Sequence, residues 1–180
     1  MQIGIISDTH NNILKTIEAL DFFLEKNITT IFHCGDWTSP DTFKNIAIEA
    51  HKRGQKIYGV LGNNDIKHKT PIYKINSEIY MPINLSEEDS DFYLFKYKKR
   101  RLAIYHGHDK SRLRELIQTF DLEAIFVGHT HTPKEEFIQN TKILNPGALS
   151  YSIPFKKRNN EIFTVGIYDL TKRNFLVYEI

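Results

Sequence analysis

Five short motifs in this sequence carry side chains that could bind a metal ion, and each follows a stretch expected to form a strand. The motifs are Asp8-Thr9-His10, Gly35-Asp36, Gly62-Asn63-Asn64-Asp65, His106-Gly107-His108 and Gly128-His129-Thr130-His131. Their mixture of imidazole and carboxylate groups suits manganese, iron or zinc better than calcium. A glycine stands beside a candidate ligand in four of the motifs, which lets the chain turn sharply and approach a bound ion closely. We therefore expect one metal centre assembled from distant parts of the chain.

Two of the motifs place candidate ligands two residues apart, Asp8 with His10 and His129 with His131. In an extended chain such side chains point to the same side, so each pair could bind one ion. Each motif taken alone also has a plainer interpretation, because these residues are common in surface loops and turns. The occurrence of five such motifs at five expected strand ends, in order, favours a functional site.

The elements that must position these motifs begin with alternating strands and helices. Hydrophobic periodicity predicts strand 2–7, helix 12–26, strand 29–34, helix 40–53 and strand 56–61. This order implies a parallel sheet with right-handed crossovers. Ligands of open α/β sheets bind outside the carboxyl ends of the strands, so the motifs can meet at one edge.

Helical spacing and capping residues define the first two helices further. The apolar face expected for the first helix consists of Ile13, Ile17, Leu20 and Leu24. Ser39 or Asp41 could cap the second helix, Pro40 suits its first turn and Gly54 would end it.

The second half of the chain is expected to be rich in strands. A polar, irregular segment over 64–91 precedes a hairpin of 91–97 and 101–106, a helix over 110–119, a strand over 123–128, short strands near 135–139 and 142–145, and a closing hairpin over 161–170 and 174–180. Two sheets packed face to face, with helices outside, would use all of these elements. The fold class is therefore α/β, and with no linker in sight residues 1–180 are expected to form a single domain.

Composition limits the classes of partner. The chain has 180 residues, of which 41% are hydrophobic, and its net charge of +2 is too mild to indicate a polyanionic partner. The single cysteine, Cys34, excludes an internal disulfide and suits a reducing cytosol. The first residues read as a strand and not as a signal peptide, and no apolar run reaches about 18 residues. We expect a cytoplasmic protein with no membrane partner.

The order of the motifs resembles the calcineurin-like metallophosphoesterase superfamily. The matching residues are Asp8-x-His10, Gly35-Asp36, Gly62-Asn63-x-Asp65, His106 and Gly128-His129-x-His131, and Asn145-Pro146-Gly147 looks most like the compact YfcE-type phosphodiesterase branch. The resemblance implies a four-layer α/β/β/α sandwich of two mixed sheets flanked by helices. It implies two divalent ions, with manganese expected first and Fe, Zn, Ni or Mg as alternatives. It also implies that one ion is held by Asp8, His10, Asp36 and His131, and the other by Asp36, Asn63, His106 and His129.

Two such ions, about 3.5–4 Å apart, could activate a bridging hydroxide and stabilise both oxygens of an in-line displacement at phosphorus. We therefore expect a metal-dependent phosphodiesterase acting on a small or nucleotide-like phosphoester. A phosphomonoesterase remains an alternative, as does a non-catalytic interaction scaffold like the retromer subunit of this fold. The complete set of ligand positions favours an enzyme.

The sequence departs from the family pattern at Asn64, where many members have a histidine that serves as general acid. An amide cannot donate a proton in that way, and general acid catalysis contributes about 10²–10⁴-fold. We therefore expect good activity only on diesters with good leaving groups. His108 could replace this acid, with Asp36 and Asn63 as the other residues expected to be catalytic. Alternatively, His108 could serve only to hydrogen-bond to a metal ligand.

Other polar features have ordinary interpretations. The basic runs 98–101 and 156–158 are expected to be solvated, so stable nucleic-acid binding is not expected. Cys34 and His33 are expected in or beside the core, and His51 and His68 at the surface. A homo-oligomer remains open.

Overall fold

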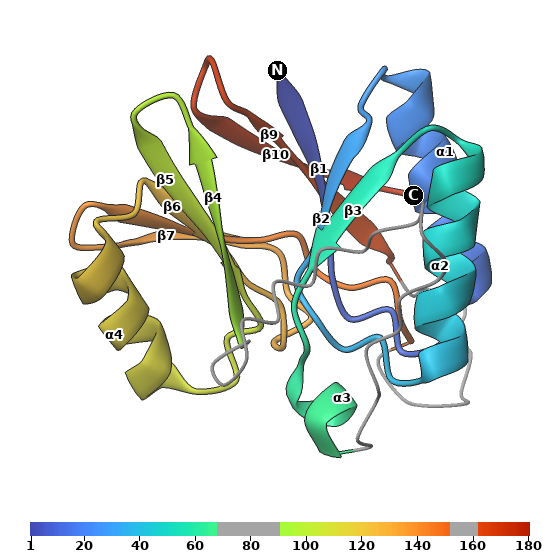
Figure 1. Cartoon of the computed structure of the whole chain (residues 1–180), viewed down its shortest axis with the longest axis horizontal. Helices are drawn as coiled ribbons and strands as arrows, with labels where there is room; N and C mark the ends of the chain where they lie inside the picture. Colours follow the sequence, from blue (N-terminus) through green and yellow to red (C-terminus); the bar gives the residue numbers. More distant parts are fainter. Residues whose placement is uncertain (68–90, 152–161) are drawn as a thin grey trace.

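A computed structural model describes residues 1–67, 91–151 and 162–180, which form two sheets packed face to face (Figure 1). The first sheet has the order β10-β9-β1-β2-β3. Its strands are β1 (Gln2–Ile6), β2 (Thr30–His33), β3 (Lys56–Gly59), β9 (Thr164–Asp169) and β10 (Asn174–Glu179). The three N-terminal strands are parallel, as predicted, and β9 and β10 add antiparallel pairs.

The second sheet has the order β4-β5-β6-β8-β7. Its strands are β4 (Phe92–Tyr97), β5 (Arg100–Tyr105), β6 (Ala124–Phe126), β7 (Lys134–Ile138) and β8 (Thr141–Asn145). Its central strands β5, β6 and β8 are parallel, and the outer strands β4 and β7 pair antiparallel. Both sheets are therefore mixed, as predicted.

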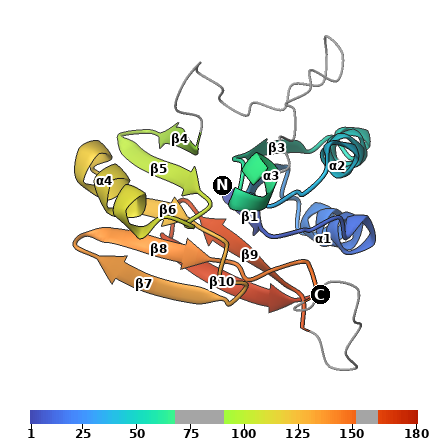
Figure 2. The same cartoon turned by 90° about the horizontal axis from the view of Figure 1, so that it is seen from below.

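Helices cover the outer faces of both sheets and complete the predicted α/β/β/α sandwich (Figure 2). Helices α1 (Ile13–Glu25) and α2 (Pro40–Lys52) lie on the first sheet, and α4 (Lys110–Phe120) lies on the second. Three apolar clusters separate the four layers, one under each helical layer and one between the sheets. A short helix, α3 (Asn63–Lys67), lies where an irregular segment was expected from residue 64 onward.

The first two helices agree with the predicted boundaries, but the buried face of α1 differs. Ser39 caps α2 by accepting a hydrogen bond from the Thr42 N–H at 3.2 Å. In α1, the predicted face was wrong by one position, since Phe23 is buried and Leu24 is 40% exposed. Gly4 on β1 explains the shift, because a Cβ there would lie 2.8 Å from the Phe23 ring. Sequence periodicity could not reveal that this glycine makes room for the ring.

The basic run 98–101 is only partly solvated. Lys98 and Lys99 form a two-residue turn, shorter than expected, and Arg100 already belongs to β5. Arg100 forms an ion pair with Glu123 at 2.8 Å, which ties the hairpin to the start of β6. Within the described ranges His33 and Cys34 are buried and His51 is exposed, as predicted. His68, most of the 64–91 segment and the basic run 156–158 lie outside the described residues.

The described helices are all too short or too polar to cross a membrane.

The contact between the two sheets centres on Phe32, and its removal should destabilise the fold. This ring is fully buried on β2 and meets Phe95 and Phe126 of the other sheet at centroid distances of 5.4 and 5.5 Å. We expect Phe32→Ala to lower the free energy of unfolding by about 3–5 kcal/mol, because the cavity cannot collapse between two sheets. Urea unfolding checks this, with Phe137→Ala as control.

Phe137 is the matched control because it is 62% exposed on β7. Its truncation should change the free energy of unfolding by no more than about 0.5 kcal/mol. Equal losses in the two variants would contradict the assignment of the core.

Candidate metal centre

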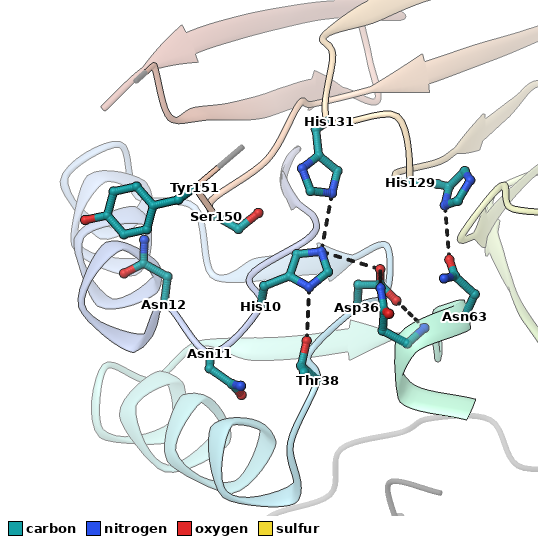
Figure 3. A pocket seen from close by; sticks show the side chains of 11 residues that line it. His10, Asn11, Asn12, Asp36, Thr38, Asn63, His129, His131, Ser150 and Tyr151 are labelled. Atoms are coloured by element: carbon teal, nitrogen blue, oxygen red, sulfur yellow. Dashed lines mark hydrogen bonds and ion pairs between the residues drawn. The ribbon is translucent and has the colours of Figure 1, made fainter. Parts of the chain in front are cut away.

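The structure brings all seven predicted ligand positions together at one edge of the sandwich. Asp8 and His10 follow β1, Asp36 follows β2, and Asn63 begins α3 after β3. The remaining three, listed by strand, are His106 after β5 and His129 and His131 after β6. The site therefore lies where carboxyl ends of parallel strands from both sheets meet, and neither sheet alone contains it (Figure 3).

The backbone at these positions turns tightly with left-handed φ angles, so the predicted extended conformation of the two ligand pairs is wrong. Five of the seven residues have left-handed φ angles: Asp8 (51°), His10 (40°), Asp36 (60°), His129 (67°) and His131 (56°). The N–H of Asp8 bonds to the Gly35 carbonyl at 3.0 Å, and that of His10 bonds to the Asp36 carbonyl at 3.1 Å. Asp8 with His10, and His129 with His131, therefore converge through tight loops and not through the two-residue period of a strand.

One group of donor atoms surrounds a point between His10 and His131. The Nε2 atoms of His10 and His131 lie 3.3 Å apart. Asp8 Oδ1 lies 3.8 Å from His10 Nε2 and 3.3 Å from His131 Nε2. Asp36 Oδ2 lies 3.5 Å from His10 Nε2. Two ligands of one ion, each about 2.1 Å from it, are separated by roughly 3.0–3.4 Å. The spacing of these atoms therefore fits a single cation.

A second group lies on the other side of Asp36. His106 Nε2 is 3.4 Å from Asp36 Oδ2 and 3.0 Å from Asn63 Oδ1, and His129 Nδ1 is also 3.0 Å from Asn63 Oδ1. The same carboxylate oxygen, Asp36 Oδ2, thus faces both groups. Among acidic and imidazole donors alone, Asp8 also joins Asp36 and His106 in a compact cluster.

The hydrogen bonds behind these atoms leave lone pairs directed at the centre. His106 Nδ1 must donate to the Cys34 carbonyl, 2.8 Å away, so a neutral ring presents an unprotonated Nε2. Asp8 Oδ2 accepts from the His129 N–H at 3.0 Å and from Ser7 Oγ at 2.6 Å. Asp8 Oδ1 is buried and has no hydrogen-bond partner among the described residues. An orphaned carboxylate oxygen of this kind fits a bound cation.

The titration behaviour of the side chains also favours positive charge at this place. Burial alone would raise the pKa of Asp36, but hydrogen bonds from His106 and Asn64 hold it well below the usual range. The pKa of His106 is raised because the Asp36 and Asp8 carboxylates outweigh its burial. The Asp8 carboxylate, whose Oδ1 lies 3.3 Å from His131 Nε2, raises the pKa of His131 against the effect of burial. The carboxylates therefore attract either protons or metal ions to the site.

A buried carboxylate, Asp65, holds the loops that carry Asp36 and Asn63. Asp65 Oδ2 accepts the backbone N–H groups of Asp36 at 2.8 Å, Trp37 at 3.2 Å and Gly62 at 2.8 Å. Its Oδ1 accepts the Thr38 N–H at 2.6 Å. The motif contained Asp65, but its role was missed because nothing in a turn sequence tells which backbone groups it will meet.

Two glycines are required by close approach to the carboxylates. A Cβ at Gly62 would lie 2.1 Å from Asp36 Oδ1, and one at Gly128 would lie 2.6 Å from Asp8 Oδ2. The predicted role of glycine as a site of close approach is thus seen at these two positions.

Asn64 stands at the usual position of the general acid, and His108 is its possible replacement; the two side chains make different contacts. Asn64 Nδ2 donates to Asp36 Oδ2 at 2.6 Å, and its backbone N–H donates to Asp36 Oδ1 at 2.9 Å. His108 packs 5.7 Å from His106 and 6.4 Å from His129, measured between ring centroids, and does not line the cavity in front of the donor groups. Burial lowers the pKa of His108, and its Nδ1 has no partner among the described residues.

A cavity of about 680 Å³ is lined by five of the seven candidate ligands and extends past them to Ser150 and Tyr151. The five ligands are His10, Asp36, Asn63, His129 and His131. Neither Ser150 nor Tyr151 was predicted from the sequence. The only signal was their position three and four residues after Gly147, at the end of the Asn145-Pro146-Gly147 segment that resembled the family.

Comparisons with known proteins agree with this geometry. The model of the calcineurin-like phosphoesterase superfamily domain matches residues 1–173. A phosphodiesterase from Methanocaldococcus jannaschii is 30% identical over 178 residues, which cover 97% of this chain and 96% of that protein. The solved structure of an archaeal phosphodiesterase is 27% identical and superposes with a TM-score of 0.72 over 100% of both chains.

More distant structures share the fold alone. YfcE, a phosphoesterase from E. coli, has a TM-score of 0.61 at 18% identity, with 100% of this chain and 98% of that chain covered. Vps29 from Entamoeba histolytica, solved in complex with zinc, has a TM-score of 0.57 at 16% identity and the same coverage. The family model spans nearly the whole chain, and the predicted ligand motifs converge at one edge of the sandwich. This chain therefore belongs to the calcineurin-like phosphoesterase superfamily.

Proposed function

We propose that this chain is a metal-dependent phosphodiesterase with a dinuclear site. The observation that carries the proposal is the position of Asp36 Oδ2, which lies 3.5 Å from His10 Nε2 and 3.4 Å from His106 Nε2. A single carboxylate oxygen between two groups of nitrogen and oxygen donors is suited to bridge two cations. The family and the phosphodiesterase relative support the reaction class.

The candidate ligands would form two groups, one for each ion. Asp8, His10, Asp36 and His131 would hold one ion, and Asp36, Asn63, His106 and His129 the other. When bound, two divalent ions supply charge that stabilises the phosphoryl oxygens and lowers the pKa of the attacking water. The mixed nitrogen and oxygen donors favour Mn²⁺ first, with Fe, Zn, Ni or Mg as alternatives.

The polypeptide contributes charge balance and orientation. The donor set contains two carboxylates, one amide and four imidazoles, so most of its members are neutral and leave net positive charge at the centre when cations are bound. The Cys34 carbonyl fixes the orientation of the His106 ring, and Ser7 together with the His129 N–H fixes Asp8. Such outer hydrogen bonds place ligand atoms before the substrate arrives.

Asn64 favours diesters with good leaving groups over monoesters. Its side chain can donate a hydrogen bond but cannot protonate a departing alkoxide. Burial, together with the nearby His106 and His129, lowers the pKa of His108 and so disfavours the protonated ring that a general acid needs, and His108 does not line the cavity. Among the described residues that line the cavity and are not candidate ligands, Tyr151 alone has an acidic side chain, and it lies at the end of the cavity away from Asn63 (Figure 3).

The alternative function is a non-catalytic interaction scaffold built on the same fold. The complete set of seven donor positions in this chain favours the enzyme. Hydrolysis therefore decides between the two proposals, and the same assay can test the role of Asp36.

We expect the chain to hydrolyse bis(p-nitrophenyl) phosphate only with added Mn²⁺, and Asp36→Asn to lower kcat/KM at least about a hundredfold, because loss of the bridging charge weakens both sites. Calorimetric titration should give two Mn²⁺ ions per wild-type chain and fewer in the variant. Asp41→Asn is the matched control, since Asp41 is an exposed acid in the first turn of α2. A metal-loaded protein inert to every phosphoester tried would favour the scaffold.

Because Asn64 stands at the usual position of the general acid, we expect a steep dependence of kcat/KM on the leaving group. Wild-type kcat/KM should fall by about 10²-fold or more from methyl p-nitrophenyl phosphate to methyl phenyl phosphate, because the phenolate must depart unprotonated. His108→Ala should slow both esters by the same factor. A selective loss on the phenyl ester would instead assign the acid to His108.

A further inference from the structure

The cavity in front of the donor groups is larger than a phosphate group needs. Its volume of about 680 Å³ falls in the range of small-molecule sites, which is about 300–1,000 Å³. In Figure 3, Ser150 and Tyr151 lie beyond His10 and His131, on the side away from Asn63 and His129. The cavity therefore has a metal-binding end and a second end formed by the chain after β8.

Ser150 presents a polar atom that no described residue binds. The residue is only 9% exposed, and its Oγ is buried without a hydrogen-bond partner among the described residues. A buried hydroxyl without a partner is unfavourable, so such groups are uncommon unless they meet a ligand or water. In Figure 3 the hydroxyl points away from Tyr151, to the side where His10 and His131 lie.

Tyr151 adds an aromatic wall beside this hydroxyl. The ring is half-buried and lines the cavity. Its contact with Phe163, at 5.3 Å between centroids and 79° between planes, is of the edge-to-face kind and holds the ring in place. Aromatic rings in such positions stack planar groups of a ligand with little loss of conformational freedom.

The position of this second end is fixed relative to the first donor group. The Leu149 N–H donates to the Ser7 carbonyl at 3.2 Å, and the Leu149 carbonyl accepts from Asn12 Nδ2 at 2.8 Å. Ser7 and Asn12 flank the loop that carries Asp8 and His10. Two hydrogen bonds therefore join the segment that carries Ser150 and Tyr151 to that loop. They hold the segment at a fixed distance from the donor atoms.

We propose that Ser150 and Tyr151 form a subsite for the ester group of the diester that does not leave, and that this group is a nucleoside. The inference rests on the proposed phosphodiesterase function, because only a diester keeps a second organic group at phosphorus. The planar base stacks on the Tyr151 ring, and a polar atom of the nucleoside hydrogen-bonds to Ser150 Oγ. The substrate class is thus a nucleotide diester.

Two esters with the same leaving group and charge test the subsite on the Mn²⁺-loaded protein. They are thymidine 5′-(p-nitrophenyl phosphate) and methyl p-nitrophenyl phosphate. Wild-type kcat/KM should be about tenfold or more higher for the thymidine ester, in line with the usual strength of stacking. Tyr151→Leu should remove most of this preference through a higher KM for the thymidine ester, so that kcat/KM falls much more for the thymidine ester than for the methyl ester, whereas Tyr151→Phe should retain the preference. Ser150→Ala should lower the preference about two- to tenfold.

A binding measurement separates failure of the subsite from failure of the proposed function. Thymidine 5′-(methyl phosphate) has a poor leaving group, so calorimetry can measure its Kd for the wild-type protein and for Tyr151→Leu. If the protein hydrolyses neither of the two nitrophenyl esters, the proposed function is overturned. Weaker binding of thymidine 5′-(methyl phosphate) by Tyr151→Leu would still support the subsite. Equal kcat/KM for both esters in the wild type, or equal Kd values in the two proteins, would overturn the subsite. Comparable melting temperatures of the variants exclude unfolding as the cause.

Discussion

The candidate centre depends on one buried carboxylate that is not itself a candidate ligand. Asp65 accepts four backbone N–H groups from the loops after β2 and β3, and so fixes Asp36 relative to Asn63. Burial raises the pKa of Asp65, and the nearby Asp36 charge adds to that effect, while the N–H bonds oppose it. Two carboxylates can share this small space because backbone dipoles stabilise one and the donor groups around the centre stabilise the other.

The left-handed backbone of the ligand loops has a cost that the sandwich must offset. Residues with positive φ are strained unless they are glycine, although Asp, Asn and His tolerate this region better than most. These are also the residue types that bind metals. Loops of this sequence can therefore curl tightly and present ligands at the same time, provided that the strands below them are fixed by the packed clusters between the layers.

The element order and the membership of the site could be predicted from the sequence because they depend on local information. Periodicity gave most of the strands and helices, and the order of five motifs identified the residues that converge. The geometry depended on partners far away in the chain and was not predictable. The buried face of α1 depends on Gly4, and the role of Asp65 depends on backbone groups in the loops after β2 and β3. The convergence of Asp8 and His10 depends on left-handed backbone in place of a strand.

Reaction and recognition are carried by different parts of this cavity. Two cations stabilise charge at any phosphoester, so the donor groups alone offer little discrimination among organic substituents. Selectivity must come from groups that touch the substituent and not the phosphorus. The segment at Ser150 and Tyr151 meets that condition, since it lines the same cavity yet supplies none of the candidate ligands. Its attachment to the Asp8 and His10 loop through Leu149 allows recognition at one end to set the position of phosphorus at the other.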